Sequence, residues 1–388
     1  MRMNTIFSSI IAGFKDQTRA DIRKWRCALK LAQSPVNPRS YTLQDLYDNL
    51  ESDGHFLAQK ELRKTATSGY GFSIIDKKTG EVNQEKTDFF CGEWFYNFLD
   101  YVLDSIFKGF TLIELTDPKN LKFEVLPRRN VIGTLGIVQR DIGDYKGIDF
   151  NAKDFQNTLI KVGKPHDLGL MANICGQLIW KRNAQQSWAE FTERFGMPLI
   201  TATTNQTSPA DIRQLDDMLA ALGESARAVL PEGTSINVTP FAGADAYKVY
   251  DEQIERINAE ISKPITGGTM VTDDGSSRSQ SEVHERNLDN KLSEADRRMV
   301  SFVVNGQLMP ILNRVNYPIN PLTDHFQFNQ SFELSLSEHW QIVSQVLNRY
   351  EVDEKWLSQT FNVPITGKRE AIDNSQLTID NALYRNFR

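Results

Sequence analysis

Three long helices are predicted in the second half of the chain, because apolar residues recur there every three or four positions. The first covers residues 168–195, and Gly196 and Pro198 are expected to end it. Its apolar face is wide and includes three aromatic residues: Trp188, Phe191 and Phe195. A helix with so broad an apolar face indicates packing against further helices.

The second long helix covers residues 245–263, and most of its surface is polar. Its narrow apolar stripe contains Ile254, Ile257 and Ile261. Pro264 is expected to end this helix, since the residue before a proline disfavours the α region. A third helix is predicted over residues 281–304, and Gly306 and Pro310 are expected to kink or break it.

The first 167 residues alternate between helical and strand patterns, which indicates a mixed α and β region. Helical spacing covers residues 18–31, 43–64 and 87–107. Strands are predicted at "GYGFSII", "FTLIELT" and "LKFEVLP", with a further pair within "NVIGTLGIVQRD". The opening "MRMNTIFSSIIAGF" has no good cleavage site for a signal peptide, so we interpret it as an arm packed on its own or a neighbouring subunit.

A compact αβ insert is predicted between the first two long helices, over residues 196–244. "LITAT" is typical of a strand, and Ser208 followed by Pro209 is a favourable helix start. "ARAVLPEGTSINVTP" predicts two strands around a Pro-Glu-Gly turn. Beyond residue 330, two short helices are predicted at 336–350 and 354–361, followed by a polar tail.

Residues 264–280 separate the second and third long helices and are rich in glycine, serine, threonine and aspartate. This composition fits a linker, a catalytic loop, or a loop that touches something passing by. Gly267, Gly268 and Gly275 allow changes of backbone conformation at little steric cost. Lys263 and Arg278 flank the segment and are candidates for transient phosphate contacts or for ordinary solvated charges.

Composition limits the classes of function. The chain has 388 residues, is 40% hydrophobic and 24% charged, and carries a formal net charge of −6. Proteins that grip nucleic acid through many phosphate contacts are usually basic, so nucleic acid is expected to pass along this chain rather than be held. Three widely spaced cysteines without a Cys-x-x-Cys motif indicate neither a zinc site nor a disulfide framework. No apolar run approaches the ~18 residues that would span a membrane.

Catalytic motifs are nearly absent. "VHERN" has Leu288 where a zinc protease helix needs its second histidine, and "FNVPITGKRE" resembles a phosphate loop only at Gly367 and Lys368. Asp273 and Asp274 lack the alternating ligands of a calcium loop. The five histidines are scattered, and Gly-x-Ser-x-Gly does not occur. We therefore predict no catalytic residue, no metal ligand and no cofactor.

Three stretches, in this order along the chain, resemble a known family. The weakest is "SIFKGFTLIEL", and the most specific runs from "WAEFTERFGMPLITATT" through "ARAVLPEGTSINV". The third is "ISKPITGGTMVTDDGSSRSQSEVHERNLD". Over about residues 53–364 the chain resembles the portal proteins of tailed bacteriophages, in the group similar to the phage Mu portal.

The resemblance implies an α+β portal fold, of which several copies form a ring, usually a dodecamer. It implies an N-terminal wing (1–167), two antiparallel stem helices (168–195 and 245–263) and, between these helices, a clip (196–244). A tunnel loop (264–280) would be followed by a channel helix that returns to the wing (281–330). A short helical, crown-like region with a polar tail (331–388) would complete the chain.

The resemblance also implies a function without catalysis. The ring would sit at one capsid vertex and conduct double-stranded DNA, without reading its sequence, during packaging and ejection. The implied partners are the large terminase subunit, a head–tail connector protein, and the major capsid and scaffold proteins. The protein would reside in the virion and, during assembly, in the host cytoplasm, with no membrane contact.

The implied site residues fall into three groups. The tunnel loop and its flanks would face the DNA channel: Lys263, Thr266, Gly267, Gly268, Thr269, Asp273, Asp274, Gly275 and Arg278. The clip would dock partner proteins: Pro198, Ser208, Asp211, Arg213, Pro231 and Glu232. The stem helices would pack through six apolar residues: Trp188, Phe191, Phe195, Ile254, Ile257 and Ile261. The alternative is a metal-dependent nuclease or hydrolase of the cytosol that uses Asp273, Asp274 and His284 of the same loop region.

Overall fold

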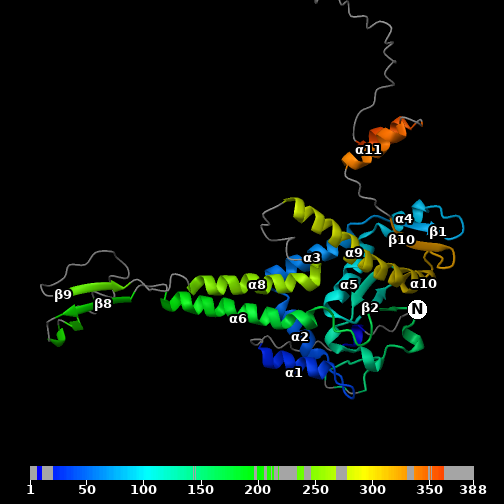
Figure 1. Ribbon diagram of the computed structural model, residues 1–388. Coiled ribbons are helices and arrows are strands. Elements are labelled where there is room, and N and C mark those ends of the chain that lie inside the picture. Colours follow the sequence, from blue (N-terminus) through cyan, green and yellow to red (C-terminus); the bar gives the residue numbers. More distant parts are fainter. Residues whose placement is uncertain are drawn as a thin grey trace, which may run out of the picture. The chain divides into compact units, whose positions relative to one another are not determined.

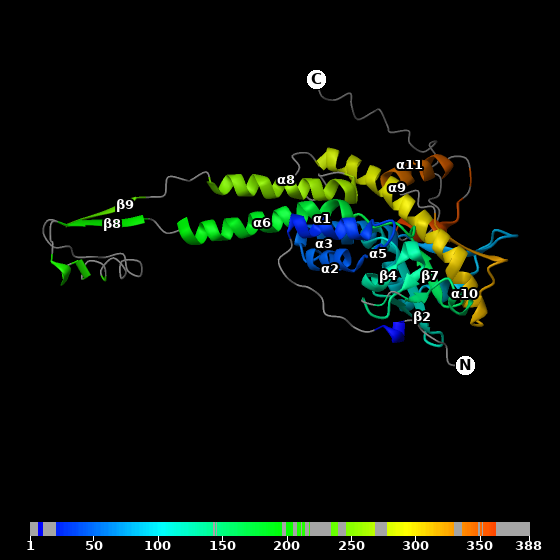
Figure 2. The same ribbon diagram turned by 90° about the horizontal axis from the view of Figure 1, so that it is seen from below.

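The computed structural model describes residues 7–10, 21–142, 144, 146–195, 199–204, 208–210, 212–213, 217, 234–239, 246–267, 278–329, 336–347, 350 and 352–361. The chain divides into two compact units, Met1–Asn329 and Gln330–Arg388. Figure 1 and Figure 2 show the elements of the structure in two views.

Five helices lie in the N-terminal part: α1 (Ile22–Ala32), α2 (Tyr41–Leu50), α3 (Gly54–Ser68), α4 (Gln84–Phe90) and α5 (Glu93–Lys108). The prediction of one helix over residues 43–64 was wrong, because Asp53 starts a new helix by accepting a hydrogen bond from the Phe56 backbone N–H at 3.0 Å. The helix predicted over 87–107 is likewise divided, with Cys91 and Gly92 between α4 and α5.

Three small antiparallel sheets accompany these helices. β1 (Phe72–Asp76) pairs with β10 (Asp324–Phe328), which returns from the far end of the first unit. β2 (Thr111–Asp117) lies between β3 (Lys122–Val125) and β7 (Leu159–Val162). The third sheet has the order β4 (Val131–Ile132), β5 (Ile137–Val138) and β6 (Ile148–Asp149). These pairings confirm the strands predicted from the sequence between residues 70 and 139.

Short 3₁₀ turns complete this region: η1 (Phe7–Ser9), η2 (Arg128–Asn130), η3 (Gly133–Leu135) and η4 (Lys153–Phe155). η1 belongs to the N-terminal arm. The backbone N–H of Phe7 donates to the buried Glu114 carboxylate at 2.8 Å, and Ile10 packs on a core cluster that includes Leu112. This part of the arm therefore packs on its own subunit, one of the two places expected for it.

Two long helices, α6 (Met171–Phe195) and α8 (Ala246–Thr266), lie side by side in both views (Figure 1 and Figure 2). They are antiparallel, because Phe191 near the end of α6 contacts Tyr250 near the start of α8. Between them in the chain, β8 (Leu199–Thr204) and β9 (Thr234–Thr239) form an antiparallel pair. The strand predicted around residues 226–230 lies outside the described residues.

The third long helix is α9 (Arg278–Val303), which starts three residues before the predicted position. It continues into a π-helical segment, η5 (Val304–Leu308), and then into α10 (Met309–Arg314). Pro310 lies at the start of α10, where its missing N–H is tolerated. The predicted interruption near Gly306 is therefore confirmed, and it takes the form of one wider turn.

Two core clusters set the positions of the long helices. In the first cluster, Val300, Val303 and Val304 of the third long helix pack with α5 and the sheets. In the second, the base of α6 and the end of α8 pack with α1, α2 and Phe107 of α5. The lower parts of α6 and α8 are thus anchored among the N-terminal helices, whereas the end of α9 packs with α5 and the sheets.

The second unit contains α11 (Leu336–Leu347) and α12 (Glu354–Phe361), as the sequence predicts. The rings of Trp340 and Phe361 meet edge to face with centroids 5.2 Å apart. Val343 and Leu357 are buried, so this ring contact and a small apolar centre join the two helices.

Candidate functional site

The isoleucine stripe predicted on the second long helix packs where α8 meets α6. Ile257 is 6% exposed and Ile261 is 0% exposed, and both belong to the cluster that contains Ile174 and Leu178 of α6. Ile254, one turn earlier, is half-buried. The stripe therefore packs as expected at its lower end, where it meets both α6 and the wing.

Farther from the base, aromatic residues join the two helices. The rings of Phe191 and Tyr250 have centroids 6.1 Å apart, within the range of favourable aromatic contacts. Trp188 is half-buried in this single subunit. The side chain of Phe195, the last residue of α6, lies outside the described residues.

Polar groups of α2, α3 and the turn between them bind α6 and α8. His55 lies 2.8 Å from the Ser262 hydroxyl, so α3 contacts α8. Lys181 of α6 forms an ion pair of 2.8 Å with Asp53, the same carboxylate that caps the start of α3. Arg182 donates to the Asn49 backbone carbonyl at 2.8 Å. These contacts could not be predicted from the sequence, because helical periodicity does not show which polar residues bind each other.

The predicted end of the second long helix was wrong. Pro264 was expected to stop the helix, but α8 continues to Thr266. Ile265 is completely buried, and the Gly267 N–H donates to the Lys263 carbonyl at 2.9 Å, which closes the last turn. Burial of Ile265 therefore outweighs the single hydrogen bond that proline removes. Gly267 has a φ of 76°, the left-handed conformation that favours glycine just after a helix.

The structure describes four of the nine residues that were predicted to line a tunnel loop. Thr266 was expected to face a channel, but it is 6% exposed and donates to the Ser262 carbonyl at 3.1 Å. Lys263 is exposed and pairs with Glu260 on its own helix. Arg278 is the first residue of α9. Five positions lie outside the described residues: Gly268, Thr269, Asp273, Asp274 and Gly275.

The clip residues are described in part. Ser208 is exposed, and its carbonyl accepts from the Ile212 N–H at 3.1 Å, as expected at a helix start. Arg213 is exposed. The remaining predicted docking residues lie outside the described residues: Pro198, Asp211, Pro231 and Glu232. β8 and β9 pair along their full lengths, from Leu199 opposite Thr239 to Thr204 opposite Thr234.

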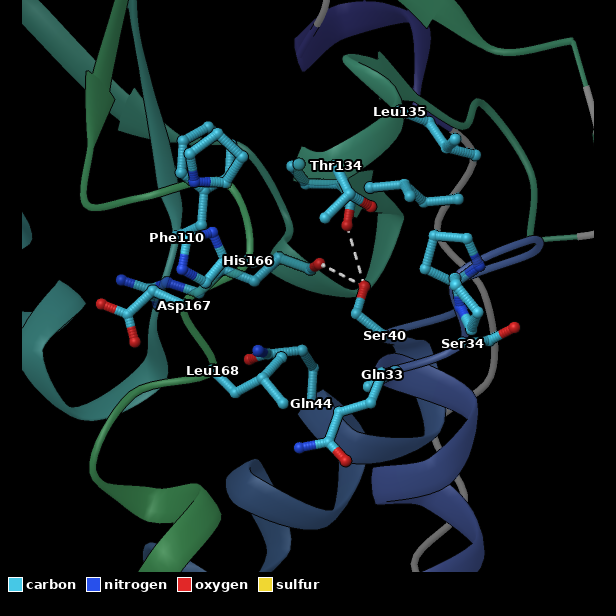
Figure 3. A pocket seen from close by; sticks show the side chains of 18 residues that line it. Gln33, Ser34, Ser40, Gln44, Phe110, Thr134, Leu135, His166, Asp167 and Leu168 are labelled. Atoms are coloured by element: carbon cyan, nitrogen blue, oxygen red, sulfur yellow. Dashed lines mark hydrogen bonds between the residues drawn. The ribbon is translucent and has the colours of Figure 1, made fainter.

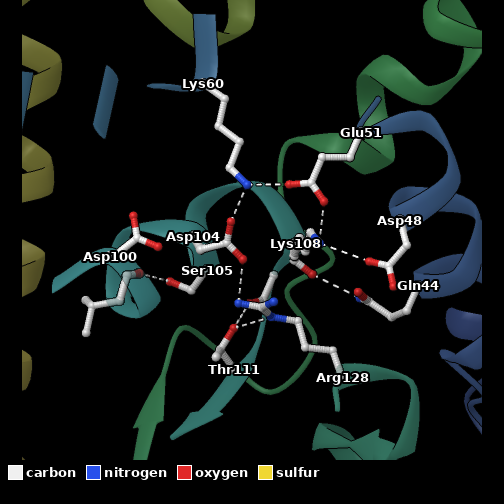
Figure 4. A network of polar contacts seen from close by, with 12 residues as sticks. Gln44, Asp48, Glu51, Lys60, Asp100, Asp104, Ser105, Lys108, Thr111 and Arg128 are labelled. Carbon is white, nitrogen blue, oxygen red and sulfur yellow. Dashed lines mark hydrogen bonds and ion pairs between the residues drawn. The ribbon is translucent and has the colours of Figure 1, made fainter. Parts of the chain in front are cut away.

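A network of charges lies between α2, α3 and α5, next to the stem base (Figure 4). Lys60 pairs with both Glu51 and Asp104, and Arg128 pairs with Asp104 at 2.8 Å. Lys108 joins the same network through Glu51 at 2.7 Å. Burial opposes ionisation of Asp104, but the charges of Arg128 and Lys60 lower its pKa to about 2. The carboxylate is therefore charged at neutral pH and holds α3 to α5.

A pocket of about 440 Å³ opens between the loop after α1, the start of α2 and the strand connections (Figure 3). Ser40 donates to the Val131 carbonyl at 2.8 Å, and Gln44 donates to the Lys108 carbonyl at 3.0 Å. His166 and Asp167 line the opposite wall. The Ser40 hydroxyl and the Gln44 amide already bind backbone carbonyls. We therefore interpret the pocket as a structural cleft.

The part of the chain that the structure describes contains no cluster of three or more histidine, cysteine, aspartate or glutamate residues that could hold a metal ion. Within that part, no helix is long and apolar enough to cross a membrane. The carboxylates of the alternative hydrolase site, Asp273 and Asp274, lie outside it, and so does the side chain of His284.

Solved structures share this fold. The neck of an empty GTA particle, computed with C6 symmetry, contains a chain with a TM-score of 0.54 and 12% identity, covering 83% of this chain and 93% of that one. The neck of a native GTA particle, computed with C12 symmetry, gives a TM-score of 0.51 and 11% identity over 83% of this chain and 94% of that one. An HK97 family phage portal protein from Corynebacterium diphtheriae matches over 79% of this chain and 97% of that one, with 12% identity and a TM-score of 0.42.

Sequence comparison reaches the same family. The portal protein of Escherichia phage Mu is 23% identical over 298 residues, which cover 70% of this chain and 56% of the phage Mu protein. The chain thus matches little more than half the length of that relative. The family model described as the portal protein of Mu bacteriophage matches residues 44–363, which include α6, residues 196–244, α8 and α9. The α+β architecture is accordingly a portal fold, and the chain belongs to the family of Mu-type phage portal proteins.

Proposed function

We propose that this protein forms a closed ring at the unique vertex of a phage capsid and conducts double-stranded DNA during packaging and ejection. The observation that carries the proposal is the pair of antiparallel helices, α6 and α8, anchored at one end in the wing and joined at the other by the β8–β9 segment. Membership of the portal family supports the same function.

Several exposed apolar residues support assembly from many copies. Trp180 of α6 is 49% exposed and Val249 of α8 is 65% exposed, while Trp188 and Phe191 are only half-buried. A ring needs a heterologous interface, in which one face of a subunit covers a different face of the next. The related necks, computed with C6 and C12 symmetry, support a ring, and a dodecamer is the number we propose.

The negative net charge of the chain supports a DNA conduit rather than a protein that binds DNA tightly. The formal net charge is −6, so a channel built from this chain offers few strong phosphate contacts. Lys263, just before residues 264–280, and Arg278, near the end of that segment, are its nearest cations, and we propose that they make weak, salt-sensitive contacts that do not read sequence. Such contacts guide DNA without holding it.

We propose that the clip, residues 196–244, docks the large terminase subunit during packaging and a head–tail connector protein afterwards. Its support is its position in the chain between the far ends of the two stem helices. The major capsid and scaffold proteins are proposed as further partners. The protein would then be found in virions and, during assembly, in the host cytoplasm.

The ring is tested with purified protein by native mass measurement and electron microscopy of stained particles. Rings of about twelve subunits with a central channel are expected. A stable monomer, combined with metal-dependent hydrolysis of DNA or of a small ester, would contradict the proposal and favour the hydrolase alternative. We assign no enzymatic activity to the chain.

The clip assignment is tested by crosslinking assembled particles to the terminase and to the connector protein. Crosslinks are expected to concentrate in residues 196–244. Crosslinks that fall mainly before Asp100 would overturn the assignment, even if the rings themselves form.

A further inference from the structure

α3 buries cationic side chains, which most surface helices expose. The side chains that it buries include three cations: Lys60, Arg63 and Lys64, with Lys60 and Lys64 only 5% and 6% exposed. The outward face instead carries Leu57 and Leu62, which are 44% and 38% exposed. Buried cations need partners, so each contact they make identifies an element that α3 holds in place.

Lys60 and Lys64 both bind α5, through Asp104 and Asp100 respectively. Arg63 binds two other elements at once. Its Nε lies 2.8 Å from Oδ2 of Asp296 on α9, and its Nη2 lies 3.0 Å from Oδ1 of the same carboxylate. Its Nη1 donates to the Ile265 carbonyl, in the last turn of α8, at 2.9 Å.

This geometry uses properties that are particular to arginine. The planar guanidinium presents several N–H groups in fixed directions, so two of them hold the Asp296 carboxylate while a third points at α8. The Ile265 carbonyl belongs to the last turn of α8, where carbonyl groups lack a helical partner and the helix dipole is negative. The side chains of Arg63 and Asp296 are 11% and 7% exposed, so water competes little for these bonds.

A second contact holds the same part of α9 to the end of α3. The guanidinium carbon of Arg297, next to Asp296 in sequence, lies 3.7 Å from the centre of the Tyr70 ring. Tyr70 follows Gly69, the residue that caps α3. Two adjacent residues of α9 thus contact the last half of α3 and the residue beyond it, in two different ways.

We propose that Arg63 is a positioning residue that ties the last turn of α8 to the middle of α9, and so fixes the spacing of the helices that flank residues 268–277. Without Arg63, the last turn of α8 and the middle of α9 lose the one side chain described here as binding both, and their spacing is held less firmly. The consequence for DNA rests on the proposed function, because these helices border the channel only in a portal ring.

The local test is hydrogen exchange followed by mass spectrometry on four variants of the full chain. Arg63→Gln is expected to increase exchange about tenfold or more in residues 258–267 and in residues 291–303, because it removes charge-assisted bonds to both. Arg63→Lys, with one point charge, is expected to protect at most one of the two regions. Asp296→Ala is expected to increase exchange in α9 while leaving the end of α8 less affected.

Lys64→Gln is the matched control. It also removes a buried cation from α3, but this cation binds Asp100 of α5. Hydrogen exchange in residues 258–267 and 291–303 of this variant is expected to stay near that of the parent. If Arg63→Gln raises exchange in them no more than Lys64→Gln does, the proposal is wrong. If the Arg63 variants fold poorly, Asp296→Ala still tests the proposal. An equal increase of hydrogen exchange in the end of α8 and in α9 of that variant would contradict it.

The functional arm measures DNA retained in heads assembled with Arg63→Gln and with Lys64→Gln. Intact rings with reduced DNA for Arg63→Gln alone are expected. Intact rings with parental DNA content would overturn the functional consequence of the tie. If the parent itself forms no rings, the proposed function fails, and the exchange experiment still decides whether Arg63 joins the two helices.

Discussion

Asn305 pairs with both backbone groups of Phe326. Its Oδ1 accepts from the Phe326 N–H and its Nδ2 donates to the Phe326 carbonyl, each at 2.8 Å. A side-chain amide thus reproduces one rung of a β-ladder on β10. Two residues later, Gln307 does the same for Lys161 of β7, at 2.8 and 2.7 Å. Both residues lie in η5, so this π-helical segment joins two sheets that do not pair with each other.

Asn305→Leu is expected to destabilise the protein by about 2–4 kcal/mol, since two partly buried backbone groups of Phe326 lose their partner. Urea denaturation of the purified protein measures the change. Gly306→Ala is the control, because a Cβ at Gly306 meets no atom within 4 Å. Equal stability of the two variants would show that the Asn305 amide contributes nothing to holding β10.

Gly169→Ala is expected to be more harmful than Gly80→Ala, although both glycines have a φ of 74°. A Cβ at Gly169 would lie 2.2 Å from the Phe107 carbonyl oxygen, whereas a Cβ at Gly80 meets nothing within 4 Å. The Gly80 variant therefore measures the backbone strain alone, about 1–2 kcal/mol. Thermal denaturation of both variants gives the comparison. Similar melting temperatures would mean that the chain around α6 relaxes to admit the methyl group.

Stability is expected to fall as pH decreases from about 4 to about 2, in part because of Asp104. Its pKa is lowered from 3.8 to about 2, so the folded state gains stability from the ionised carboxylate above the unfolded pKa and loses it toward the folded pKa. The largest contribution is about 2 kcal/mol. Asp104→Asn should flatten this part of the pH dependence, and Asp154→Asn, at an exposed position, should not. Parallel curves for parent and Asp104→Asn would contradict the assignment.

Phe191→Glu is expected to loosen the distal stem, because it places a charge against Tyr250 in a half-buried position. Hydrogen exchange in the first turns of α8 should rise, and ring assembly should weaken. Ala189→Glu, at an exposed position on the same helix, is the control. Unchanged exchange and assembly for Phe191→Glu would show that this aromatic contact does not support the stem.

Shortening residues 268–277 while keeping Gly267 is expected to leave rings intact and to reduce the DNA retained in heads. The last turn of α8 and the middle of α9 have their own contacts, through Ile265 and Asp296, so assembly should not need this segment. Electron microscopy of the variant and measurement of packaged DNA beside the parent check the prediction. Normal rings with normal DNA content would show that the segment only connects two helices.

Local patterns in the sequence were enough to predict the long helices, the strands between residues 70 and 139, and the family. Those features depend on local periodicity and turn residues, which act over a few positions. The isoleucine stripe ending at Ile261 was readable for that reason, and so was the interruption near Gly306. The resemblance of three separate stretches to portal proteins indicated the family, and the family match over residues 44–363 confirmed it.

Where helices end and which polar groups bind each other depend on contacts between residues far apart in the sequence. Pro264 disfavours a helix locally, but burial of Ile265 and the Arg63 contact to its carbonyl carry α8 to Thr266. Arg63 and Asp296 are 233 residues apart, and no periodic pattern couples two single charges over that distance. Long-range pairs of this kind form because burial of one charge requires a partner, and the fold alone determines which partner is within reach.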